Sequence, residues 1–215
     1  MVINTRMQIL TRPTKVIISF ILSFVSIFLY LKYRNEERKA CMFAMISSTL
    51  GDIFMTDIIG IGDFSTYPGA TFFIIAHIIY AICFIKAGKK KNYKLLNKGF
   101  ILGLLLIIVD IVALTILMFK VTGKNQGMFF PLLLYILFIG FNTVSQFSYA
   151  YNEKGIRVML MIAMLLFVVS DFLVFLPMLN IYPESPTYND YIWFTYIPAQ
   201  LFILLFNSDL KINNY

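Results

Sequence analysis

The sequence predicts an all-α fold, a polytopic transmembrane helical bundle with seven spans and a cytoplasmic C-terminus. Three observations support this prediction: the apolar composition, the number of long apolar runs, and the placement of the basic residues. Of the 215 residues, 60% are hydrophobic and 13% are charged, whereas soluble domains are about 45–50% apolar and about 25% charged. We therefore expect an integral membrane protein in which residues 1–215 form a single transmembrane domain.

A membrane-spanning helix needs about 20 apolar residues, and seven runs approach that length. They cover residues 14–32, 39–58, 69–86, 99–119, 129–149, 157–179 and 190–207. The first run follows basic residues as a signal peptide would, but it has no small-residue cleavage site and leads directly into KYRNEERK. We interpret it as a retained helix.

The formal net charge of +7 would suggest nucleic-acid binding in a soluble protein, but here the basic residues follow the loops. Segments 32–39, 86–98 and 150–157 and the C-terminal tail hold thirteen of the 18 Lys and Arg residues. Because cytoplasmic loops are enriched in Lys and Arg, we place these segments in the cytoplasm and expect no nucleic-acid partner. This topology leaves Arg6, Arg12 and Lys15 outside, a conflict that an eighth helix before residue 1 would remove.

Two further features lie on the expected cytoplasmic side. Cys41 and Cys83 are too few for a disulfide framework, and we expect them to be free thiols. The lysine-rich loop KAGKKKNYK, residues 86–94, fits a topology determinant, although it could also bind anionic lipid headgroups.

Polar side chains interrupt the apolar runs at spacings that place them on shared helix faces. Ser48 and Asp52 are four residues apart, as are Tyr196 and Gln200, so each pair faces one side of its helix. The other polar residues of the runs are His77, Tyr80, Asp110, Tyr135, Asn142, Gln146, Ser170 and Asp171. At about 1.5 Å per residue, the three aspartates lie about 18–21 Å from the basic end of their helix, and His77 lies about 13 Å from its own. We therefore expect one shared interior site.

Interhelical hydrogen bonding would account for Asn142, Gln146 and Ser170. An aspartate at the centre of a membrane helix costs about 2.5–3.5 kcal/mol, so Asp52 and Asp171 indicate function. A carboxyl group in an apolar site can keep its proton near neutral pH and act as a general acid. A pair of such groups fits acid-catalysed hydrolysis of a lipid bond, and it equally fits the proton relay of a transporter.

Several other chemistries lack support in the sequence. One histidine gives no recognisable metal-ligand motif, and we expect no metal and no cofactor. The chain contains no Gly-x-Ser-x-Gly elbow, no Walker motif and no HExxH motif.

Several stretches together resemble one family. SSTLGDIFMTD, GATFF and AHIIYAICF resemble the S-x-x-GD … G-x-x-x-F-x-x-AH-x-x-Y block of the lysoplasmalogenase (YhhN-like) membrane family. LLFVVSDFLVF, TYIPAQLFI and PLLLYILFI resemble its SD, AQ and P-x-x-x-Y segments. The resemblance implies hydrolysis of the vinyl ether bond of lysoplasmalogens, which releases a fatty aldehyde and a glycerophospho-base. It also implies eight spans, the missing one preceding Arg12 and Pro13, which stand where the family usually has Lys-Pro.

The spacing and the resemblance together give the candidate site. The candidate catalytic residues are Asp52, Asp171 and His77, and the sequence does not decide which aspartate is the acid. The candidate substrate-binding residues are Tyr80, Tyr196, Gln200, Ser48, Asp110, Asn142 and Tyr135. Asn142 stands where the family would have Met, and Ile197 replaces a second Tyr.

The expected partners are a lysophospholipid substrate and membrane lipids, and the expected location is the cytoplasmic membrane of a bacterium, as a multi-pass protein. Two alternatives stay open at this point. One is a proton-coupled membrane transporter, and the other is a non-catalytic lipid-binding or sensory seven-helix protein.

Overall fold

The computed structural model describes residues 10–119, 121, 127, 129–153, 157–181 and 186–206. Within these ranges the chain forms seven α-helices, one short 3-10 helix and no strand. The elements are α1 (Arg12–Tyr33), α2 (Glu36–Met55), η1 (Gly62–Ser65), α3 (Thr66–Lys90), α4 (Lys98–Met118), α5 (Phe129–Asn152), α6 (Arg157–Met178) and α7 (Pro186–Phe206). Each apolar run expected from the sequence corresponds to one α-helix, which confirms the all-α prediction for the described residues. Arg6 and the C-terminal tail lie outside them.

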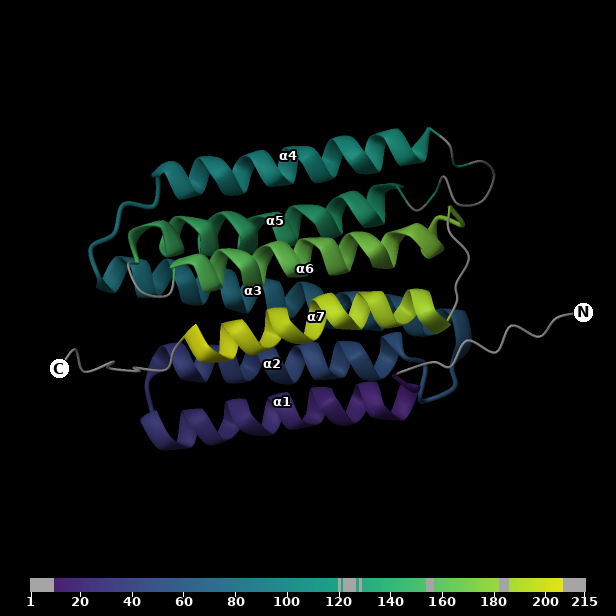
Figure 1. Ribbon diagram of the computed structural model, residues 1–215, viewed down its shortest axis with the longest axis horizontal. Helices are drawn as coiled ribbons and strands as arrows, with labels where there is room; N and C mark the ends of the chain where they lie inside the picture. Colours follow the sequence, from purple (N-terminus) through teal and green to yellow (C-terminus); the bar gives the residue numbers. More distant parts are fainter. Residues whose placement is uncertain are drawn as a thin grey trace, which may run out of the picture.

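The seven helices run along a common axis with α1 on one flank and α4 on the other (Figure 1). Consecutive helices pack as antiparallel pairs, α2 on α3, α4 on α5 and α6 on α7, and α3 also packs on α5. The interior is therefore enclosed mainly by α2, α3, α5, α6 and α7.

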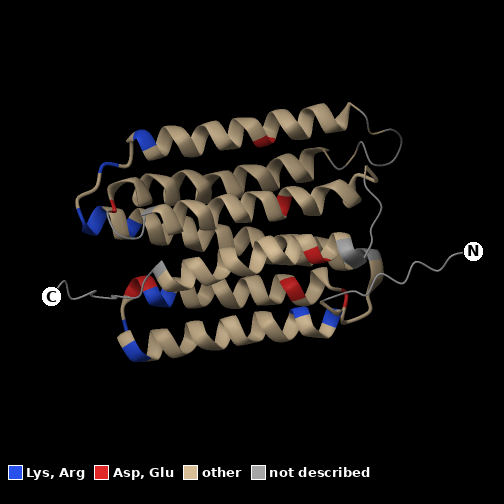
Figure 2. Cartoon of the chain, in the orientation of Figure 1, with Lys and Arg blue, Asp and Glu red and all other residues tan. Residues whose placement is uncertain are grey.

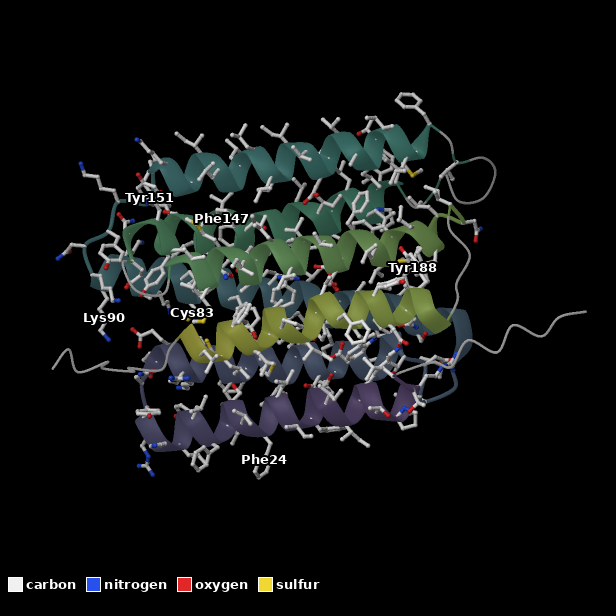
Figure 3. The ribbon with its side chains drawn as sticks, in the orientation of Figure 1. Phe24, Cys83, Lys90, Phe147, Tyr151 and Tyr188 are labelled. Atoms are coloured by element: carbon white, nitrogen blue, oxygen red, sulfur yellow. The ribbon has the colours of Figure 1, made fainter. Side chains whose placement is uncertain are left out.

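The outer surface of the bundle is apolar. Ile108 and Val109 of α4 are exposed, and Phe24 of α1 points away from the bundle (Figure 3). Five helices are long and apolar enough to cross a membrane, namely α1, α3, α4, α5 and residues Val158–Met178 of α6. A helix that is apolar on all sides yet unburied suits a lipid environment, so the chain is a multi-pass membrane protein.

Helices α2 and α7 run among these five but are more polar. The first turn of α2 carries Glu36, Glu37, Arg38 and Lys39, and α7 contains Asn189, Asp190 and Gln200. Both helices also carry polar residues inside the bundle, Asp52 on α2 and Gln200 on α7. The count of seven spans and the cytoplasmic C-terminus stay predictions.

Charge is distributed unevenly along the bundle axis. Apart from Arg12 and Lys15 at the start of α1, the described Lys and Arg residues gather at the end where α2 and α4 begin and α3 ends, whereas the aspartates inside the bundle lie in the other half (Figure 2). Cys41 and Cys83 are at the basic end, and both are buried thiols that form no disulfide bond, as the sequence predicts.

Local sequence explains the helix boundaries. The side chain of Asn35 accepts a hydrogen bond from the backbone N–H of Arg38 at 2.7 Å and thereby caps α2, and Asn97 caps α4 in the same way. Such side-chain oxygens satisfy N–H groups that the first helical turn leaves unpaired. Helix α2 ends at Met55, earlier than the expected 58, because Asp57 has a φ of 50° that no α-helix accommodates. The Oδ1 atom of Asp57 accepts a hydrogen bond from the backbone N–H of Gly62 at 3.0 Å, within the turn that follows α2.

A buried ion pair joins the beginnings of α1 and α7. Lys15 Nζ donates to Asn189 Oδ1 at 3.0 Å and lies 3.5 Å from Asp190 Oδ1, with both charged side chains almost fully buried. It also lies 5.9 Å from the centre of the Trp193 ring. The sequence shows Lys15 only as a charge at the start of a run, whereas in the structure it forms a buried contact between α1 and α7.

We expect Lys15→Met to destabilise the protein by roughly 3–5 kcal/mol, because it removes the cation of a buried ion pair and leaves the Asp190 carboxylate buried without that cation. The double variant Lys15→Met with Asp190→Asn restores most of the loss. Thermal unfolding of the purified protein in detergent measures both. A single variant that melts like the wild type would show that the pair contributes nothing to stability.

Candidate active site

A cavity of about 130 Å³ lies among α2, α6, α7 and the beginning of α3. Its lining includes Asp52 from α2 and Asp171 from α6, together with Tyr196 and Trp193 from α7 and Phe73 from α3. The two carboxyl groups that the sequence singles out therefore face the same space, although 118 positions separate them in the chain. One ligand in the cavity could contact both.

Asp52 accepts two hydrogen bonds at the same oxygen. Ser19 of α1 donates to Oδ2 at 2.5 Å, and the hydroxyl of Tyr196 donates to the same atom at 3.0 Å. Among the described residues, none donates to Oδ1. In the neutral form of Asp52, Oδ2 would therefore be the carbonyl oxygen, because it accepts both hydrogen bonds. The carboxyl proton of that form would be on Oδ1.

A chain of buried hydrogen bonds fixes the direction of the Tyr196 hydroxyl. Gln200 Nε2 donates to the Tyr196 oxygen at 2.9 Å, and the Tyr80 hydroxyl donates to Gln200 Oε1 at 3.1 Å. Because the Tyr196 oxygen already accepts a bond, its own proton is directed at Asp52. The sequence predicts Tyr80, Tyr196 and Gln200 as site residues, and the structure places them in one relay that ends at Asp52.

Asp171 lies in a second polar group that centres on His77. His77 Nε2 lies 3.5 Å from Asp171 Oδ2, and the Tyr135 hydroxyl donates to Oδ1 at 3.4 Å. On the other side of the ring, the Asn142 amide nitrogen lies 3.1 Å from Nδ1. That nitrogen also donates to Met164 Sδ at 3.6 Å, which fits its assignment as the NH₂ group.

The Asn142 contact sets the tautomer of His77. An amide N–H donor at Nδ1 requires a lone pair there, which leaves the ring proton on Nε2, toward Asp171. The imidazole therefore turns its Nε2–H toward Asp171 Oδ2, which lies 3.5 Å away and accepts no hydrogen bond from the described residues.

A second, apolar cavity of about 210 Å³ adjoins the first. Both are lined by Phe73, Asp171 and Met178. The second extends between α3, α5 and α6 to Tyr67 and Leu134, whose side chains are exposed on the outside of the bundle. An apolar passage thus connects the lipid-facing surface with Asp171.

Two predicted site residues line neither cavity, although Asp110 is near enough to Asp171 to interact with it electrostatically. Ser48 is buried and Asp110 is half-buried on α4, and neither lines either cavity. The sequence places Asp110 at a depth in the membrane similar to that of Asp52 and Asp171. Depth alone does not determine toward which neighbouring helix a side chain points. Among the described residues, no group of three or more His, Cys, Asp or Glu side chains is arranged to hold a metal ion.

Ser19, whose hydroxyl makes the shorter of the two hydrogen bonds to Asp52 Oδ2, is not among the residues predicted from the sequence. Ser19, Ser23 and Ser26 are spaced by four and three residues in the first apolar run, so they share one helix face. In the structure all three are buried, and the Ser23 hydroxyl lies 2.7 Å from Thr49 Oγ1 of α2. This serine stripe was the available signal that α1 packs against the polar face of α2.

Fold and site together define the class: a multi-pass helical membrane protein with two carboxyl groups on one internal cavity that adjoins an apolar passage. Residues 7–206 match the model of the YhhN family, and the chain belongs to that family, which confirms the resemblance seen in the sequence. Searches of curated proteins and of solved structures found no match.

Proposed function

We propose that the protein is a lysoplasmalogenase-like hydrolase that cleaves the vinyl ether bond of lysoplasmalogens. The supporting observation is that Asp52 and Asp171 line one cavity. Membership of the YhhN family agrees with this proposal, as does the apolar passage, which would take the alkenyl chain from the bilayer of a bacterial cytoplasmic membrane.

The proposed reaction begins with proton transfer to carbon. Asp52 donates the proton on Oδ1 to carbon 2 of the alkenyl chain, which makes carbon 1 an oxocarbenium ion. In this proposal Asp171 acts in its carboxylate form: it stabilises the cation and takes a proton from the water that attacks carbon 1. In the resulting hemiacetal, Asp171 returns that proton to the glyceryl oxygen while Asp52 regains one from the hemiacetal hydroxyl. The bond between carbon 1 and the glyceryl oxygen then breaks, which gives a fatty aldehyde and a glycerol hydroxyl. Two carboxyl groups divide the work in the same way in glycosidases.

The other polar residues act through these two groups. Ser19 and Tyr196 hold Oδ2 of Asp52 and so direct Oδ1 to the substrate. His77, whose tautomer is set by Asn142, presents its Nε2–H to Asp171 Oδ2 at 3.5 Å. Both sets are positioning residues, because their contacts are to the carboxyl groups rather than to reacting atoms.

The direct test is to incubate the purified protein with a 1-alkenyl-lysophospholipid and, separately, with its saturated 1-alkyl analogue, and to assay fatty aldehyde. We expect aldehyde from the alkenyl lipid alone, because an alkyl ether has no carbon–carbon double bond to protonate. Proton-coupled flux across proteoliposomes without aldehyde would instead support the transporter, and lipid retained unaltered would support a lipid-binding protein.

A further inference from the structure

A large groove on the outer side of α2 and α3 is not part of the candidate active site. It has a volume of about 530 Å³. Most of its lining is apolar, formed on α2 by Ala40, Phe43, Ile46 and Leu50 and on α3 by Phe72, Ile75, Ile79 and Ile82. Leu50 and Phe72 line this groove, whereas Asp52 and Phe73 line the cavity of the candidate active site. The two spaces therefore lie on opposite faces of the α2–α3 pair.

One end of the groove is charged. Glu36, Glu37, Lys39 and Lys86 lie there, close to Cys83 and Lys90, which Figure 3 labels at the basic end of the bundle. Glu37 Oε1 accepts a hydrogen bond from Lys90 Nζ at 3.1 Å, so these two charges compensate each other. Lys39 and Lys86 are exposed and form no ion pair with any residue that the structure describes. The two positive charges of Lys39 and Lys86 and the negative charge of Glu36 give this end of the groove a net charge of +1.

The length of the groove matches one leaflet of a bilayer. From Lys39 to Leu50 is 11 residues, which is about 16 Å along the helix at about 1.5 Å per residue. The hydrocarbon region of a bilayer is about 30 Å thick, so one leaflet contributes about 15 Å. A lipid with its phosphate at Lys39 would therefore have its acyl chain along the apolar part of the groove.

We propose that this groove is a specific site for an anionic glycerophospholipid. Its phosphate lies between Lys39 and Lys86, and one acyl chain packs along Phe43, Ile46 and Ile79. The charge of +1 at the polar end complements the single negative charge of a phosphodiester headgroup. Inorganic phosphate would make no use of the apolar wall, and an annular lipid would make no use of the two lysines.

Native mass spectrometry of the detergent-purified protein, titrated with phosphatidylglycerol or phosphatidylcholine, tests the headgroup contact. We expect phosphatidylglycerol to be retained preferentially and its retained fraction to fall at least fivefold in the double variant Lys39→Gln with Lys86→Gln. The double variant Lys89→Gln with Lys94→Gln removes the same charge from the neighbouring loop and should retain the lipid. Equal losses in both variants, or no loss in the first, would overturn the proposal.

A second pair of variants tests the acyl chain. Ile75 lines the groove and is 41% exposed, so Ile75→Trp fills the groove without disturbing the core. Val109 on α4 is 61% exposed and gives the matched control Val109→Trp. Loss of phosphatidylglycerol in Ile75→Trp alone is the expected result. Unchanged binding in Ile75→Trp would refute an acyl chain seated in the groove. An equal loss in both variants would show that a tryptophan outside the groove weakens binding as much, which would also refute it.

Discussion

Asp52→Asn is expected to lower kcat for aldehyde release by at least about 100-fold, within the range of about 10²–10⁴-fold that a general acid contributes. An amide cannot donate the proton that carbon 2 requires. The protein should remain folded, because the Asn carbonyl still accepts from Ser19 and Tyr196, which now bond to Asp52 Oδ2. The measurement is the steady-state rate of aldehyde release from a 1-alkenyl-lysophospholipid, together with the melting temperature.

Ser19→Ala is the matched control, because it keeps the proton of Asp52 and removes one hydrogen bond to Oδ2. We expect it to lower kcat only about 2–10-fold, as the loss of one hydrogen bond of about 0.5–1.5 kcal/mol would. An Asp52→Asn protein that keeps more than a tenth of the wild-type rate would exclude Asp52 as the acid.

Asp171→Asn is expected to cause the second large loss, again about 10²–10⁴-fold in kcat. The neutral amide can neither stabilise the oxocarbenium ion nor take a proton from the attacking water. The KM should change little, because the apolar passage that would hold the chain is intact apart from this one side chain. A change in KM with kcat unaffected would make Asp171 a binding residue and contradict its role as a base.

Asp110→Asn controls for the general effect of removing a carboxyl group from a membrane helix. Asp110 lines neither cavity, so its replacement should leave kcat near the wild-type value. If Asp110→Asn reduced the rate as much as Asp171→Asn, the loss could not be ascribed to the shared cavity.

The helices were predictable because each is written locally in the sequence. An apolar run of membrane length has one physical solution, a helix, and α2 and α4 begin at residues whose side chains cap them, Asn35 and Asn97. The end of α2 was less predictable, since the apolar run continues through Ile58 while the positive φ of Asp57 ends the helix.

Which side chains meet was only partly predictable. Spacing placed Tyr196 and Gln200 on one face correctly, because an i, i+4 relation is set within a single helix. The contact of Ser19 with Asp52 depends on how α1 packs against α2, and the position of Asp110 outside both cavity linings depends on how α4 is rotated. Both are properties of helix pairs, which a single helix sequence does not determine.

The most direct test of carbon protonation by a fixed carboxyl group is hydrolysis in D₂O, with the aldehyde reduced at once to the alcohol. The measurement is the configuration at carbon 2 of that alcohol. We expect one deuterium in a single configuration, because Asp52 delivers it from one face of the double bond. Deuterium distributed equally between both configurations would mean that a free enol is released and protonated in solution, which would contradict the proposed mechanism.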